Sequence, residues 1–83
     1  MNELDILSLS NNKDYVIGKM LKFRDKEYLL LIEVDNDDNL LDEKLILEKS
    51  KVNNTLLLKE ISDTLIFKIV SQKFAKMLLE DLI

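Results

Sequence analysis

The chain has 83 residues, of which 47% are hydrophobic and 34% are charged, and its formal net charge is −4 at pH 7. It contains no histidine, no cysteine and a single glycine, which excludes Ser-His-Asp and Cys-His catalysis, imidazole or thiolate metal sites, and glycine-rich nucleotide loops. We therefore expect one small domain over residues 1–83 that has no cofactor and is not an enzyme.

The chain carries no pattern typical of export or membrane insertion. Residues 1–5 are acidic where a secretion signal would be basic. The longest apolar run, residues 28–32, is far shorter than the roughly 18 residues that a membrane helix needs. These features predict a cytoplasmic protein without a membrane partner.

Two strands are predicted in the first part of the chain, near residues 4–9 and 15–23. Asn11 and Asn12 tolerate the backbone of tight turns and predict a hairpin between the strands. The second strand alternates loosely, and its pattern predicts Tyr15, Ile17, Leu21 and Phe23 on one face and Val16, Gly18 and Met20 on the other. Gly18 lies inside this strand, where a glycine often marks a bulge or a close approach of two backbones.

Three further strands are predicted near residues 27–35, 44–49 and 55–61, with turns near 36–39 and 50–54. The strand at 27–35 has the clearest alternation, with Tyr28 and Leu30 on one face and Leu29 and Leu31 on the other. Either Leu45 and Leu47 or Ile46 should join Leu29 and Leu31.

An amphipathic helix is predicted near residues 63–82, capped by Ser62 or Asp63. Its apolar stripe consists of Ile66, Phe67, Val70, Phe74, Met77 and Leu78. Together these elements predict an α+β fold: an antiparallel β-meander of about four to five strands with one C-terminal helix packed on one face.

A single helix covers only one face of such a sheet, and an uncovered apolar face on a small protein usually marks an interaction surface. Leu29 and Leu31 are the firmest residues of that face, and Leu79 and Leu82 lie off the main helix stripe. We take these four leucines as the candidate interaction surface. The predicted function is a non-enzymatic domain that binds a protein partner or forms a homodimer.

An alternative function is weak nucleic-acid binding by a basic patch on the outer helix face. The patch consists of Lys68, Lys73 and Lys76. Three lysines without arginine or neighbouring aromatic residues neutralise few phosphates, and the negative net charge repels nucleic acid. A solvated helix face explains the same residues.

The acidic segment between Glu33 and Glu43 begins like a calcium-binding EF-hand loop at residues 35–39 (DNDDN). The later positions of that loop do not match, because Leu40 stands in place of the turn glycine and Ile46 in place of the bidentate glutamate. We interpret the segment as a solvated acidic loop, which leaves ion binding open.

The order of these elements resembles a bacterial family called domain of unknown function 1292. The likeness rests on residues 6–9 (ILSL), 23–31 (FRDKEYLLL), 34–35 (VD) and 58–63 (LKEISD), and on Phe74. Asp25 and Lys26 stand where that family often has Asp-Gly. The resemblance implies a small cytoplasmic bacterial protein of unknown activity.

Overall fold

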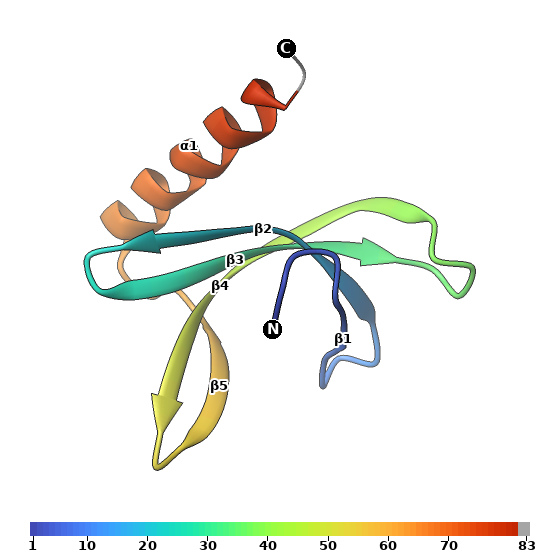
Figure 1. Cartoon of the computed structure of the whole chain (residues 1–83), viewed down its shortest axis with the longest axis horizontal. Helices are drawn as coiled ribbons and strands as arrows, with labels where there is room; N and C mark the ends of the chain where they lie inside the picture. Colours follow the sequence, from blue (N-terminus) through green and yellow to red (C-terminus); the bar gives the residue numbers. More distant parts are fainter. Residues whose placement is uncertain (82–83) are drawn as a thin grey trace.

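A computed structural model of the chain describes residues 1–81. It contains a five-stranded antiparallel sheet in the order β1-β2-β3-β4-β5, followed by one helix. The elements are β1 (Ile6–Ser8), β2 (Asp14–Phe23), β3 (Lys26–Val34), β4 (Leu40–Val52), β5 (Thr55–Glu60) and α1 (Thr64–Glu80). The helix lies on one side of the sheet, whereas β1 and the far ends of β4 and β5 lie on the other (Figure 1). The predicted α+β meander is confirmed.

The largest difference from the predicted strands concerns β4, which spans 13 residues (Leu40–Val52) where residues 44–49 were expected. Its pairing with β3 runs from Leu40 to Lys49, and its pairing with β5 runs from Leu47 to Val52. Pairing with neighbouring strands therefore extends β4 into segments whose own residues favour turns. The turn after it shrinks to Asn53 and Asn54, whose φ angles of 51° and 66° fit a two-residue hairpin turn.

Gly18 lies at a bulge in β2, which is one of the two roles predicted for it. The register with β3 shifts between Ile17 and Lys19, and a Cβ on Gly18 would come within 2.9 Å of the Ile32 side chain. The extra residue reverses the alternation beyond it. Leu21 and Phe23 consequently pack on the helix side and not beside Tyr15, so the face predicted for these two residues is wrong.

The sheet has an apolar core on each face. The helix-side core is built around Tyr28 and Leu30 of β3 and Val70 and Phe74 of α1. The opposite core, which we call the concave core, contains Tyr15, Ile17, Leu29, Leu31 and Leu47, with Leu7, Leu9, Met20, Leu45 and Leu58 packed against it. The sheet curls so that residues of β1 and β5 cover this second face.

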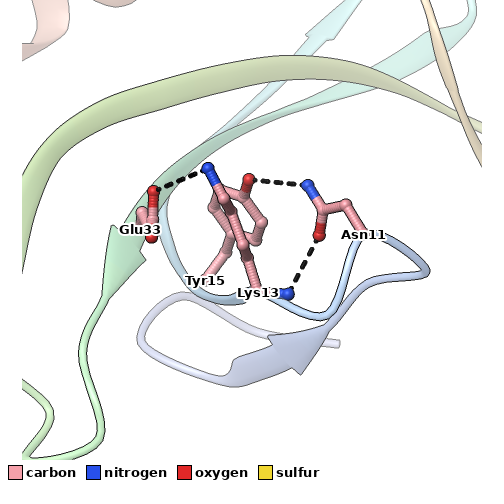
Figure 2. A network of polar contacts seen from close by, with 4 residues as sticks. All are labelled: Asn11, Lys13, Tyr15 and Glu33. Carbon is pink, nitrogen blue, oxygen red and sulfur yellow. Dashed lines mark hydrogen bonds and ion pairs between the residues drawn. The ribbon is translucent and has the colours of Figure 1, made fainter.

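A small polar network fastens the β1–β2 turn over the concave core (Figure 2). Asn11 donates from Nδ2 to the hydroxyl oxygen of the buried Tyr15 at 3.1 Å, and its Oδ1 accepts from the backbone N–H of Lys13 at 3.0 Å. The Lys13 ammonium lies 3.6 Å from the Glu33 carboxylate on β3. The network gives the buried tyrosine hydroxyl a partner and ties the turn to the sheet.

Helix α1 begins as predicted at the Asp63 cap, whose Oδ1 accepts from the backbone N–H groups of Leu65 at 2.9 Å and Ile66 at 3.1 Å. Its buried stripe matches the predicted one except at Phe67, which is 44% exposed. Among residues 1–81, no helix has the length and apolar character needed to cross a membrane.

Candidate functional site

The structure separates the four leucines of the predicted interaction surface. Leu29 and Leu31 are 0% exposed in the concave core, because the curled sheet covers the face that was expected to be open. Leu79 is 63% exposed on the outer side of α1, and Leu82 lies outside the described residues. The expectation that Leu29 and Leu31 lie on an open apolar face is therefore wrong for the single chain.

The three helix lysines are exposed but do not form a compact patch. Lys68 and Lys73 lie about 140° apart around the helix axis. The Lys73 ammonium is 5.3 Å from the centre of the Phe23 ring, on the sheet side of the helix. Lys76, three residues after Lys73, is its neighbour on the helix surface, and the three lysines together spread over this arc of the helix.

The acidic loop between β3 and β4 is organised by its own hydrogen bonds. Asp35 Oδ1 accepts from the backbone N–H groups of Asp37 and Asn39, both at 2.9 Å, and Asp35 Oδ2 accepts from Asn39 Nδ2 at 3.3 Å. These donors, Asn39 first, lower the pKa of the Asp35 carboxyl below its ordinary value. Within residues 1–81, no group of three or more acidic side chains is arranged to hold a metal ion.

A different group of charged residues gathers where β4 and β5 extend past the β2–β3 turn. We call the projecting part of these two strands, residues 49–58, the β4–β5 arm (Figure 1). Residues at its base and of the β2–β3 turn line a cleft of about 700 Å³. It is lined by five lysines, Lys22, Lys26, Lys49, Lys51 and Lys59. Its other lining residues are Asp25, Glu27, Glu48, Ser50, Leu56 and Met1. We call this the lysine cleft.

Glu48 is the buried charged residue among those that line the lysine cleft, with 7% of its surface exposed, and it pairs with Tyr28 on the helix side of the sheet. Its two carboxylate oxygens have separate partners: Oε1 lies 3.0 Å from the Lys26 ammonium and Oε2 lies 3.3 Å from the Lys59 ammonium. The hydrogen bond from Lys26 is the main cause of a lowered pKa of Glu48, and it outweighs the effect of desolvation. One carboxylate thus positions two ammonium groups.

This ion-paired carboxylate predicts a pH dependence of stability. Because the pKa of Glu48 is lower in the folded protein than in the unfolded chain, its ionised form favours folding at neutral pH. That contribution is lost as the pH falls through the folded-state pKa. We expect Glu48→Gln to lower the free energy of unfolding by about 1 kcal/mol at pH 7, and by much less at pH 3. Urea unfolding at both pH values measures this.

A suitable control is Glu60→Gln, because Glu60 is exposed on the same hairpin and forms no ion pair within the described part of the chain. We expect it to change stability at pH 7 by less than about 0.5 kcal/mol. An equal loss for Glu48→Gln at pH 7 and at pH 3 would contradict the assigned role of the ionised carboxylate.

Strand β5 forms one edge of the sheet, since β4 is the only strand that pairs with it among the described residues. In the β4–β5 arm Leu56 and Leu57 are exposed, and so is Val52 at its tip. An edge strand presents unpaired backbone N–H and C=O groups that can pair with another strand. Exposed leucines beside such groups make this edge an accessible apolar surface of the sheet.

Sequence reasoning did not identify the lysine cleft, although a usable signal was present. Once Asn53 and Asn54 are taken as a two-residue hairpin turn, counting back along both strands places Glu48 opposite Lys59, as the register has it. The assignment of a longer turn at residues 50–54 concealed this pair. The contribution of Lys26 depends on the separate β2–β3 hairpin.

No match with a known protein supports the assignment of this site, and the resemblance to domain of unknown function 1292 stays a prediction. Comparisons with protein-family models, with curated proteins and with solved structures found no match to this chain.

Proposed function

We propose that the protein is a non-enzymatic interaction domain that self-associates through the free edge of β5. The observation that carries this proposal is the exposed β5 edge with its leucines: Leu57 is 45% exposed and Leu56 is 41% exposed. Burial of these side chains and pairing of the open backbone groups both favour the addition of a strand.

Charge complementarity supports a second copy of the chain as the partner. Antiparallel pairing of two β5 strands places the Thr55 end of one strand beside the Glu60 end of the other. The Thr55 end belongs to the arm that carries Lys51, which lies opposite Leu56 in the register. Beyond the Glu60 end, β4 continues without a β5 partner toward Asp42 and Glu43. A two-fold arrangement therefore brings the arm end that carries Lys51 of one copy next to Glu60 of the other copy, twice.

The expected association is weak. A six-residue strand edge (Thr55–Glu60) buries less surface than the roughly 800 Å² per partner of a standard stable interface. We expect a dissociation constant in the micromolar range or weaker. Added salt should weaken the dimer further, because its charge pairs are exposed.

Sedimentation velocity between about 5 and 500 μM, a range that spans a micromolar dissociation constant, tests the proposal. We expect the natural chain to shift from monomer to dimer over this range. Leu57→Lys adds a charge to the exposed edge without disturbing either core, and we expect this variant to stay monomeric. Charged residues, lysine above all, are the usual means of blocking an edge strand.

Leu65→Lys is the matched control, because Leu65 is 64% exposed and lies on the helix, not on the edge strand β5. The control makes the same chemical change and should dimerise like the natural chain. A natural chain that remains monomeric at all concentrations overturns the proposal. Equal effects of Leu57→Lys and Leu65→Lys would also overturn it, because net charge and not the β5 edge would then govern association.

A further inference from the structure

The lysine cleft concentrates positive charge in a protein that is negative as a whole. Five lysines against three carboxylates line it, while the chain has a net charge of −4. Within residues 1–81, Lys22 and Lys51 form no ion pair, and Lys26 and Lys59 share the single carboxylate of Glu48. The cleft therefore keeps an excess of positive charge after its internal pairs are formed.

Part of this charge is held in place before any ligand arrives. The Glu48 carboxylate, nearly buried, fixes the ammonium groups of Lys26 and Lys59 at 3.0 and 3.3 Å. Lys49 lies 3.6 Å from the more exposed carboxylate of Glu27 and is held less firmly. Positioned charges reduce the ordering cost of binding, which distinguishes these lysines from the separated lysines of the helix.

We infer that the lysine cleft binds an oligophosphate group, that is, two or more phosphates joined in a chain. Lysine binds phosphate as a point charge, without the planar fork by which arginine selects a single phosphate or carboxylate. No arginine and no aromatic side chain lines the cleft, so it offers neither fork recognition nor a stacking surface for a base. Such a site responds to charge density, which is highest in a phosphate chain. Its volume of about 700 Å³ accommodates one.

The test is a titration of the protein at about 20 μM, a concentration suited to a ligand with a micromolar dissociation constant. Binding is measured by calorimetry and by amide chemical shifts. The probes are inorganic tripolyphosphate, orthophosphate, ATP and a twelve-residue oligothymidylate. We expect tripolyphosphate to bind at least about tenfold more tightly than orthophosphate, because its charge is greater. ATP should bind through its phosphates, with shifts at Lys26, Ser50 and Lys59. Added salt should weaken all binding.

Lys22→Glu combined with Lys51→Glu should lower the affinity for tripolyphosphate at least about tenfold. Neither lysine takes part in an ion pair of the described structure, so the fold should remain intact, and far-UV circular dichroism checks this. The control, Lys68→Glu combined with Lys76→Glu, has the same net charge and should change the affinity less than about threefold, because the helix lies outside the cleft.

Three results would overturn the inference. The first is no shift at millimolar tripolyphosphate, and the second is an equal loss of affinity in the two double variants. The third is tighter binding of the oligothymidylate than of tripolyphosphate, which would assign the cleft to a nucleic-acid backbone. Self-association does not affect these results if the same affinities are obtained at a lower protein concentration, at which the chain is monomeric.

Discussion

Leu31→Ala should lower the free energy of unfolding by about 2 to 5 kcal/mol, the range for truncating a fully buried leucine. Leu31 is 0% exposed in the concave core, surrounded by residues of β1, β2 and β4. A domain of this length has a total stability of about 4 to 12 kcal/mol, so the loss is a large fraction of the whole. Thermal and urea unfolding followed by circular dichroism measure it.

Leu31→Glu distinguishes the structure from the hypothesis that Leu31 faces a partner. In the concave core the carboxylate would be buried without a counter-ion, at a cost that exceeds the stability of a small domain. We expect this variant to be unfolded at neutral pH. On an open face the same variant would be folded and would lose only binding. Leu65→Ala, on an exposed helix position, is the matched control and should change stability by less than about 0.5 kcal/mol.

The order and type of the elements could be predicted because local patterns determine them. Alternation in β3 separates Tyr28 and Leu30 from Leu29 and Leu31, and the structure places the two pairs in different cores. The covering of the concave core could not be predicted. It depends on how far the sheet curls, and this curvature arises from strand twist and from the bulge at Gly18. A sequence pattern records which side chains are apolar, but not whether a distant strand reaches them.

The candidate site could likewise be predicted only in part from the sequence. The lysines of β4 and β5 are visible in the sequence, but their meeting with Lys26 requires two hairpins to lie side by side in the correct register. Glu48 would be taken for an ordinary surface glutamate from its neighbours alone. Only the pairing of Tyr28 with Glu48 and of Glu48 with Lys59 explains why it is nearly buried.

Phe74→Ala should lower the free energy of unfolding by about 3 to 5 kcal/mol. Phe74 is 1% exposed and, with Val70, joins α1 to Tyr28 and Leu30 of β3. Removal of the ring leaves a cavity between the helix and the sheet that neighbouring side chains fill only in part. Phe67→Ala is the matched control, because it truncates the same side chain at an exposed position of the same helix, and we expect it to cost less than about 1 kcal/mol.

The unfolding of the Phe74→Ala variant should show whether the two cores unfold together. Consecutive residues of β3 belong to opposite cores: Leu29 and Leu31 to the concave core, Tyr28 and Leu30 to the helix-side core. A loss of order in β3 therefore weakens both cores together, and we expect a single cooperative transition. Amide hydrogen exchange tests this expectation. Protection should fall by the same free energy in α1 and in the central strands β2 and β3. Faster exchange in α1 alone, with the strands unchanged, would mean that the sheet and its concave core fold without the helix.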